Sequence, residues 1–493
     1  MPAQAELVTI IGSRESPGLH WVIAGDGFTS AELPELRKAA LELAREMLNA
    51  PELATHSAVW NVHVLEAASR ESGVDDSATG KFVNTAFDGS LGCGSNSRVA
   101  CVDWDKLDAT LLGQAAPAAQ LTVILNTSDY VGSSNSSGII VSRNVHAARI
   151  TVHEMGHRVA DLADEYVDAV VAEEWRPYYF EGRFPNVTTV TDPQQVPWRH
   201  WLADAATEVG LYEGAFYVQN GFYRPKQDSF MRTLEAPIGQ VNAEAWLRAQ
   251  YRALPPLSEV SPAVPQVRGL AGESLEFSVV SVWPRAAVSL RWFVDGIEVP
   301  GSRDASRYRF DSDGGVHEVE VRACDATGRI RATDAREAQA SHTWKVSPET
   351  PGFAGKALRA QSPASWLRIR VDGTGHRLVG LRHRGAAVAQ LPLQGEADWQ
   401  YTLLAGDGAV LASGAIADPR LVRSALSAPG EAHAGHAAVQ VESGHYLIGV
   451  PQGLAPGKLP QKLRIAATVA GKAKLAPSGF VPDGAIEIRL DSP

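Results

Sequence analysis

The sequence predicts a multidomain chain in which an α/β (α+β) domain is followed by two all-β domains. Three observations lead to this fold class. The chain has 493 residues, which is too long for a single hydrophobic core. Helical and strand patterns are mixed up to about residue 256, and almost only strand patterns follow. Prolines interrupt the pattern at 255–265 and again at 348–351, where we expect the domain boundaries.

The first domain is expected to span residues 1–256. Apolar residues at helical spacing predict an amphipathic helix over 31–48, and Thr29 with Glu32 has the spacing of a capping box at its start. A second helix is expected to begin near Asn144, a good cap residue, and a third to close the domain. The closing helix is expected over 242–254. Strands are expected over 60–64, 121–125 and 139–141.

The second domain is expected over residues 257–350 and the third over 351–493. Short strands spaced roughly ten residues apart predict a β-sandwich in the second domain. Its aromatic and glycine positions, such as those of the 292–296 stretch, resemble Ig-like modules of the polycystic-kidney-disease-repeat kind. The third domain alternates apolar and polar residues, as in 367–371, and is expected to be β-rich without a motif that carries chemistry.

Charge and apolar patterning exclude several classes of function. The net charge is −11 and no run of lysine or arginine occurs, which argues against a nucleic-acid binder. No apolar stretch approaches the length of a transmembrane helix. The first five residues contain no secretion signal, although Ala3-Gln4-Ala5 has the form of a cleavage-site tail. Cys93 and Cys101 could close a small disulfide loop, but their spacing alone does not decide it.

The segment with the clearest chemistry contains the motif H-E-x-x-H. His153 and His157 are four residues apart, so on a helix both rings lie on one face and can reach one metal ion. Neutral imidazole is a good zinc ligand. Glu154 is beside that face and can reach a water without being a ligand, which is the general-base position of a zinc peptidase.

A catalytic zinc also needs a third protein ligand and an open position. On a straight helix Asp164 faces the same way as the histidines but lies about 10 Å beyond His157 along the axis. It can reach the same ion only if the helix ends soon after His157 and the chain turns back. Asp161 has the same difficulty to a lesser degree. A glutamate from a later helix, Glu173 or Glu174, is another alternative.

The motif continues as L-A-D-E-Y over 162–166 and resembles the zinc motif of the immunoglobulin-A peptidase family, a metzincin-like group. Further stretches similar to that family follow in order and cover roughly residues 7–250. They are Gly25-Asp26-Gly27-Phe28-Thr29, Ser69-Arg70-Glu71-Ser72-Gly73, Asn186-Val187-Thr188, Glu213-Gly214-Ala215, Gly221-Phe222-Tyr223-Arg224-Pro225 and Ser229-Phe230-Met231-Arg232.

This resemblance implies a metzincin-like zinc-peptidase domain with one catalytic Zn2+. It implies that Asp164 is the third ligand and that Met231 forms a Met-turn beneath the metal. One position departs from the metzincin pattern: where a glycine usually lets the helix stop, this chain has Ala160, with Asp161 next. The choice of ligand between Asp164 and Asp161 therefore stays open at this point.

Other residues are candidates for supporting roles. Tyr166 and Tyr223, and also Tyr130, could donate a hydrogen bond to a reaction oxyanion. Glu213 could orient a metal ligand by a hydrogen bond without touching the metal. The strand ahead of the motif, 139–142, is expected to offer an edge that a substrate joins as an extra strand.

We therefore expect a secreted, periplasmic or cell-surface zinc endopeptidase that cleaves an extracellular protein or glycoprotein. In the expected mechanism Glu154 acts as general base toward a metal-activated water. The two β domains are expected to contact a surface or a glycan. The alternative is an adhesion or glycan- or protein-binding protein whose zinc site is structural or degenerate. An open fourth metal position would favour the enzyme, and four protein ligands would favour the alternative.

Overall fold

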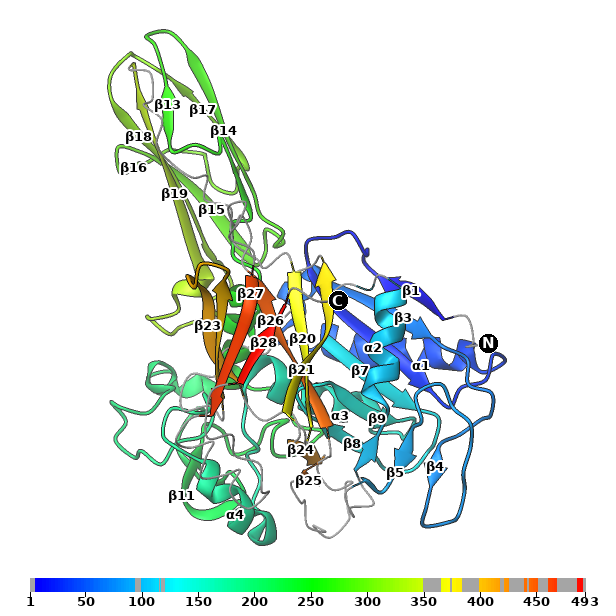
Figure 1. The fold of residues 1–493 in the computed structure, drawn as a ribbon. Coiled ribbons are helices and arrows are strands. Elements are labelled where there is room, and N and C mark those ends of the chain that lie inside the picture. Colours follow the sequence, from blue (N-terminus) through cyan, green and yellow to red (C-terminus); the bar gives the residue numbers. More distant parts are fainter. Residues whose placement is uncertain are drawn as a thin grey trace.

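The computed structural model describes residues 5–93, 99–114, 116, 120–348, 365–372, 375–383, 399–416, 421–424, 439–440, 443–450, 460–467 and 486–490. These residues form a mixture of a few helices and several β-sheets. Figure 1 shows an elongated β-sandwich that projects away from a broader part, in which the helices lie and against which the strands of the C-terminal region are placed.

The broader part is built on a mixed sheet. Four of its strands run parallel to one another, and the strands at its two ends are antiparallel to their neighbours. In spatial order the strands are β1 (Glu6–Ile11), β3 (Trp60–Glu66), β2 (Leu19–Asp26), β7 (Gln120–Leu125), β9 (Ile139–Ser142), β8 (Gly132–Ser134), β24 (Leu421–Ser424) and β25 (Val439–Gln440).

Helices cover both faces of this sheet because its central strands are buried on both sides. Successive side chains of β2 point to opposite faces. Trp21 and Ile23 pack in one hydrophobic cluster with residues of α1 (Leu33–Leu48), α3 (Ala147–Ala160) and α5 (Gln240–Ala253). Val22 and Ala24 pack in another cluster with α2 (Trp104–Gly113). Helix α3, which carries the H-E-x-x-H motif, is therefore held between the sheet, α1 and α5.

Local sequence signals account for the helix starts. Glu32 accepts hydrogen bonds from the backbone N–H of Thr29 (2.8 Å) and from its hydroxyl (2.7 Å), and Pro34 lies in the first turn of α1. Asn144 accepts from the His146 N–H at 2.8 Å just before α3 begins. The predicted strands around residues 60, 121 and 139 are present as β3, β7 and β9.

One expectation about this sheet is wrong. The strand over 139–142 is not an edge, because β9 is paired with β7 on one side and with β8 on the other. A tight return of the chain through Asn135 and Gly138 folds β8 back onto β9, and the sequence showed β8 only as a short run of glycine and serine. The position beyond β9 belongs to β8.

Shorter elements complete the first part of the chain. Cys93 and Cys101 are joined in a disulfide, with their Cα atoms 6.0 Å apart. The further helical segments are α4 (Ala169–Trp175), η1 (Ala54–Val59), η3 (Arg176–Tyr178), η4 (Arg199–Trp201) and η5 (Ala205–Thr207). The further strands are β4 (Asp75–Asp76), β5 (Ser90–Leu91), β6 (Ala100–Cys101), β10 (Tyr212–Ala215) and β11 (Val218–Arg224).

The projecting part consists of two sheets that pack through an aromatic core. Phe277 of one sheet lies 4.9 Å, between ring centroids, from Trp344 of the other, and Trp292 stacks on Trp344 at 5.9 Å. One sheet contains β12 (Glu259–Ser261), β14 (Ser274–Val280) and β17 (Arg307–Asp311). The other contains β13 (Gln266–Arg268), β19 (Gln339–Ser347), β18 (His317–Asp325), β15 (Val288–Val294) and β16 (Ile297–Glu298), with η6 (Arg336–Ala338) before β19.

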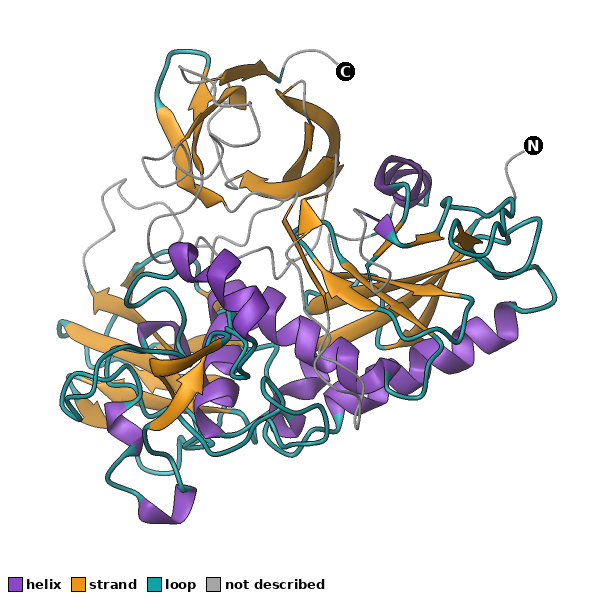
Figure 2. Cartoon of the chain, turned by 90° about the horizontal axis from the view of Figure 1, so that it is seen from below, coloured by secondary structure: helices purple, strands orange, loops and turns teal. Residues whose placement is uncertain are grey.

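The described strands of the C-terminal region curve around a core of their own (Figure 2), which includes Ile369, Trp399, Leu403 and Tyr446. They are β20 (Ser365–Asp372), β21 (Gly375–His383), β22 (Trp399–Ala405), β23 (Val410–Ile416), β26 (Ser443–Val450), β27 (Pro460–Ala467) and β28 (Ile486–Arg489). Strands β24 and β25 come from the same region of the sequence but join the central sheet instead.

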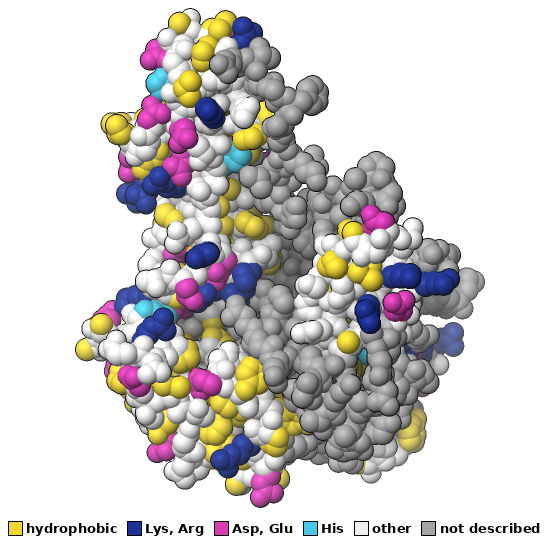
Figure 3. Space-filling view, turned by 60° about the vertical axis from the view of Figure 1, so that its left-hand side comes forward, with side chains coloured by type: hydrophobic (Ala, Val, Ile, Leu, Met, Phe, Trp, Pro, Cys, Tyr) yellow, Lys and Arg dark blue, Asp and Glu magenta, His cyan; other side chains and the backbone are white. Residues whose placement is uncertain are grey.

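Helix length and surface charge can be compared with the apolar and charge patterns of the sequence. Among the helices in the described ranges, none has the length and apolar character needed to cross a bilayer. On the face drawn in Figure 3, basic and acidic side chains are interspersed rather than gathered by sign.

Candidate metal centre

The two histidines of the motif are buried, and their rings are held by the backbone. The Nδ1–H of His153 donates to the Phe230 carbonyl at 3.0 Å, and that of His157 donates to the Leu162 carbonyl at 2.7 Å. A carbonyl can only accept, so each neutral ring carries its proton on Nδ1 and leaves Nε2 as a lone-pair acceptor. This is the tautomer in which a histidine can ligate a metal through Nε2.

The chain turns back directly after the helix, as a third ligand from this segment requires. Helix α3 ends at Ala160, and Asp161 adopts the left-handed conformation with φ of 53°. Aspartate tolerates this region better than most residues with a side chain. The N–H of Leu162 then bonds back to the Gly156 carbonyl at 3.2 Å. The reversal returns Asp164 to the face that carries the histidines.

Three acceptor atoms converge at this point. The Oδ1 of Asp164 lies 3.1 Å from His153 Nε2 and 3.4 Å from His157 Nε2, and the two Nε2 atoms lie 3.2 Å apart. In the neutral rings none of these atoms has a proton to share, so their close approach is repulsive without a cation. A tetrahedral ion with bonds of about 2 Å places neighbouring ligand atoms roughly 3.3 Å apart. The His153–His157–Asp164 group therefore fits a metal ion.

The second oxygen of Asp164 has its own partner. The hydroxyl of Tyr217 donates to Oδ2, which leaves Oδ1 directed at the histidines. Burial would raise the pKa of Asp164, but in the metal-free protein protonated His157 and His153 would hold that pKa well below its usual range through charge and hydrogen bonds. Tyr166 packs against Tyr217, with 5.2 Å between ring centroids. Burial and the nearby charge of Asp164 raise the pKa of Tyr166 well above its ordinary value, so its hydroxyl stays protonated.

Glu154 lies in the interior beside this group. Its Oε2 accepts a hydrogen bond from the hydroxyl of Ser134 on β8. Its Oε1 is buried without a hydrogen-bond partner, which is costly unless a ligand or water completes it. The motif thus places one carboxylate oxygen with unused accepting capacity next to the converging acceptors.

The turn around Met231 packs closely against helix α3. Met231 is fully buried, and the Cβ that a residue larger than glycine would carry at Gly156 would lie 2.9 Å from the Met231 Sδ and 2.9 Å from the Phe230 ring. Glycine therefore permits this close approach of α3 to the turn. The turn is also tied to the returning chain, because the Glu165 N–H donates to the Met231 carbonyl at 2.8 Å.

The buried carboxylate of Glu165 connects the Met231 turn to neighbouring segments by hydrogen bonds. Glu165 accepts hydrogen bonds from Asn186 (3.0 Å), Asn242 (3.0 Å) and Ser229 (2.8 Å). Burial raises the pKa of Glu165, and these three donors oppose that rise. The network connects the residue after Asp164 to the loop at 186, to α5 and to the start of the Met231 turn.

The structure does not bring every candidate residue to this group. Glu213 is exposed on the β10–β11 hairpin and accepts from the Gly221 N–H of the same hairpin at 2.9 Å. Tyr223 pairs through its backbone with Thr188. Tyr130 packs against His146, ahead of α3. Glu173 is exposed on α4, and the side chain of Glu174 lies outside the described residues.

Sequence reasoning missed Tyr217 and Ser134. Tyr217 lies two residues after the 213–215 motif, but its hydrogen bond to Asp164 depends on a left-handed backbone with φ of 67°, for which the sequence gives no signal. Ser134 is one of several serines in a polar stretch, and only the pairing of β8 with β9 places it beside Glu154.

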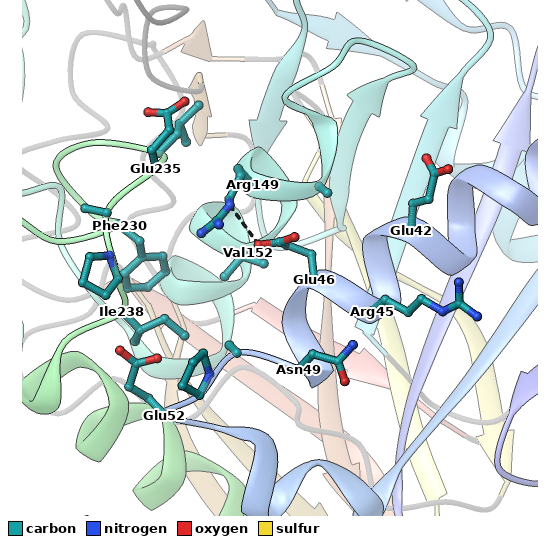
Figure 4. A pocket seen from close by; sticks show the side chains of 16 residues that line it. Glu42, Arg45, Glu46, Asn49, Glu52, Arg149, Val152, Phe230, Glu235 and Ile238 are labelled. Carbon is teal, nitrogen blue, oxygen red and sulfur yellow. Dashed lines mark ion pairs between the residues drawn. The ribbon is translucent and has the colours of Figure 1, made fainter.

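A cavity of about 650 Å³ lies between α1, α3 and the segment that follows Met231. Figure 4 shows its charged lining, with Arg149 paired to Glu46 and the Phe230 ring at one side. None of the three converging ligands lines this cavity. The His153–His157–Asp164 group and the cavity are therefore separate features.

The helix presents two histidines with a carboxylate beside them, and the chain then returns an aspartate to the same point. This arrangement is typical of a metallopeptidase. Residues 8–207 match the family model described as IgA Peptidase M64. The match supports the expected resemblance to the immunoglobulin-A peptidase family over these residues. It indicates that the chain is a peptidase, a hydrolase whose substrates are proteins or peptides.

No curated protein matched the sequence. Solved structures similar to parts of the chain include fibronectin(III)-like modules of Clostridium thermocellum CbhA (18% identity, 18% of this chain and 92% of that chain, TM-score 0.14). Others are Bacteroides uniformis beta-glucuronidase 3 (13% identity, 55% and 28%, TM-score 0.15) and the Bacteroides ovatus protein SGBP-B in complex with a mixed-linkage heptasaccharide (11% identity, 47% and 70%, TM-score 0.14). At these TM-scores the similarities carry no argument.

Proposed function

We propose that the chain is a metzincin-like zinc endopeptidase with His153, His157 and Asp164 as metal ligands and Glu154 as general base. The observation that carries this proposal is the convergence of three acceptor atoms within 3.1 to 3.4 Å of one another. Zinc suits two imidazole nitrogens and one carboxylate oxygen, and a set of three protein ligands leaves a fourth position open.

The protein groups then divide the work. Zinc supplies Lewis acidity to peptide hydrolysis when it is bound. Glu154 takes a proton from the attacking water at Oε1 and delivers it to the departing amine. Ser134 holds the other carboxylate oxygen so that Oε1 keeps its orientation. Tyr166 is a protonated donor near Asp164 and Glu154, which suits stabilisation of an oxyanion. Met231 forms the apolar floor of the site.

We further propose a protein or glycoprotein outside the cytoplasm as substrate, with the β domains as the parts that contact a surface or a glycan. The Cys93–Cys101 disulfide supports this location, because disulfides persist in oxidising compartments. We propose that the peptidase domain spans 1–256, an Ig-like β-sandwich 257–350 and the C-terminal β region 351–493.

The test measures metal content and hydrolysis of labelled casein by the purified full-length chain and its variants. Glu154→Gln should keep one zinc per chain and lose at least about a thousandfold in kcat, because a general base and its charge are removed. Casein hydrolysis at the unmodified rate in this variant would exclude Glu154 as the base.

A matched pair of substitutions tests the third ligand. Asp164→Asn should reduce zinc affinity strongly, because the carboxylate that faces both Nε2 atoms is lost. Asp161→Asn keeps a residue that tolerates the left-handed turn and should keep the zinc. The reverse result would assign the ligand to Asp161.

A further inference from the structure

Strand β8 lies beside the helix that carries Glu154, and the edge of β8 that faces away from β9 lies close to that residue. Ser134 of β8 contacts Glu154 directly, and one side of β8 is paired with β9. The other side faces away from β9, and its N–H and C=O groups can pair with a further extended strand. A peptide that added itself there would run past the general base.

This edge is occupied by the chain itself. Strand β24 of the C-terminal region pairs antiparallel with β8, with Arg423 opposite Ser134 and Ser424 opposite Ser133. Figure 1 shows β24 and β25 beside β8, below the ends of β21 and β26. The residue of β8 that holds Glu154 is thus one of the two that the C-terminal strand covers.

Side-chain contacts outside the ladder hold the C-terminal region in place. His445 of β26 donates its backbone N–H to the hydroxyl of Ser137, in the turn between β8 and β9, at 2.9 Å. The His445 Nε2 lies 3.0 Å from Asp105 Oδ1 of α2, and Arg370 of β20 pairs with the same aspartate. Because these contacts tether the region, β24 is presented to β8 at a high effective concentration.

The pairing itself is short. Only two residues of each strand are in register, while an extended substrate could pair along the whole of β8. A short ladder held by a tether can open and close without unfolding either part. The contact therefore has the properties of a reversible competitor rather than of a permanent strand of the sheet.

We infer that β24 is an intramolecular competitor that occupies the edge where the main chain of an extended peptide substrate pairs beside Glu154, so that the C-terminal region restrains the peptidase. This inference rests on the proposed function, since it assigns a regulator to the same site. It also gives the C-terminal region a role other than surface attachment.

A disulfide trap in the full-length chain tests this inference. Ser133→Cys combined with Ser424→Cys places two cysteines directly opposite each other, within the span that a disulfide requires. The control is Thr402→Cys with Ser413→Cys, which joins an opposite pair inside the C-terminal region. The readout is cleavage of labelled casein by the zinc-loaded proteins, oxidised and reduced.

We expect the oxidised Ser133/Ser424 variant to lose about tenfold or more of its activity and to regain it on reduction, while the control changes little. A variant that weakens the pairing of β24 with β8 should change the cleavage rate in the opposite direction. Arg423→Pro removes a strand N–H in β24 and should raise the rate several-fold, about as far as the closed population falls. Val410→Pro, at the exposed start of β23, is its control.

The two failures are distinguishable. If the trapped enzyme cleaves casein as fast as its reduced form, or if Arg423→Pro has the rate of the Val410→Pro control, β24 is not a competitor and the inference is overturned, although the peptidase assignment stands. If neither the unmodified chain, nor Arg423→Pro, nor either reduced variant cleaves casein with zinc bound, the proposed function fails and the inference fails with it.

Discussion

At the residue scale, the second oxygen of Asp164 shows how a proposed metal ligand is kept in position. Tyr217 donates to Oδ2, so rotation of the carboxylate would break a buried hydrogen bond. Groups that orient a metal ligand in this way affect metal affinity although they never touch the metal. Tyr217 is thus a positioning residue for the proposed zinc site.

We predict that Tyr217→Phe lowers zinc affinity by about ten- to a hundredfold, because Asp164 loses its orienting donor. Affinity is measured by competition with a chromogenic chelator. The matched control is Tyr212→Phe on the neighbouring strand, whose hydroxyl donates to the Glu208 carbonyl away from the metal group. Equal affinities for the two variants would show that Tyr217 does not position the ligand.

Local spacing explains why the sequence predicted part of this site and not the rest. The positions of His153, Glu154 and His157 follow from the period of one helix. Asp164 is also local, but its arrival depends on the turn at Asp161, whose left-handed backbone takes the place of the expected glycine. Tyr217 reaches the site from a segment 53 residues away from Asp164 in sequence. Ser134 reaches it through a short hairpin without apolar alternation, so the sequence marks neither residue.

At the element scale, the contact between α3 and the Met231 turn depends on one glycine. Glycine usually weakens a helix because of its conformational freedom. At Gly156 this cost is offset by close packing, since an added Cβ would lie 2.9 Å from both the Met231 sulfur and the Phe230 ring. The Phe230 carbonyl in turn holds the ring of His153. The packing of two elements therefore controls the orientation of His153, a proposed metal ligand.

We predict that Gly156→Ala destabilises the fold by about 1–3 kcal/mol, because overpacking exceeds the gain in helix propensity. Gly113→Ala is the matched control at the end of α2, where an added Cβ meets nothing within 4 Å, and it should be neutral or stabilising by up to about 1 kcal/mol. Urea unfolding measures both. A stabilised Gly156→Ala variant would show that the turn yields easily and does not constrain α3.

The elements themselves were predicted more readily than their neighbours in space. Periodicity identified α1, α3, α5 and the buried strands because each buries a regular apolar face. Which strand lies at the edge was mispredicted, since β8 is only three residues long and has no apolar alternation. The pairing of β24 with β8 joins segments almost 290 residues apart, so it depends on tertiary docking rather than on local pattern.

At the scale of the whole molecule, buried hydrogen bonds connect the β-sandwich to the peptidase part. Glu244 of α5 accepts the backbone N–H groups of Arg331 (2.6 Å) and Ala332 (2.7 Å) through one oxygen. Its other oxygen accepts from His200 (2.6 Å) and Trp201 (2.5 Å) of the peptidase part. One carboxylate thus bonds to both parts, which favours a fixed orientation between them.

The pKa of Glu244 gives this connection a pH dependence. Burial would raise it, but the hydrogen bond and charge of His200 and the hydrogen bonds of Trp201 and Ala332 lower it below its ordinary value of 4.5. A carboxyl whose folded-state pKa is depressed contributes stability that is present above its unfolded-state value. That contribution is lost as the pH falls from about 4.5 through the folded-state pKa.

We predict that Glu244→Gln lowers the free energy of unfolding by about 2–3 kcal/mol at pH 7, because an amide cannot accept from all four donors. The difference from the unmodified chain should shrink below pH 4.5, where Glu244 itself becomes protonated. Glu208→Gln, at an exposed carboxylate, is the control. Thermal unfolding between pH 3 and pH 7 measures both, and a difference that stayed constant with pH would show that the charge of Glu244 does not stabilise the connection.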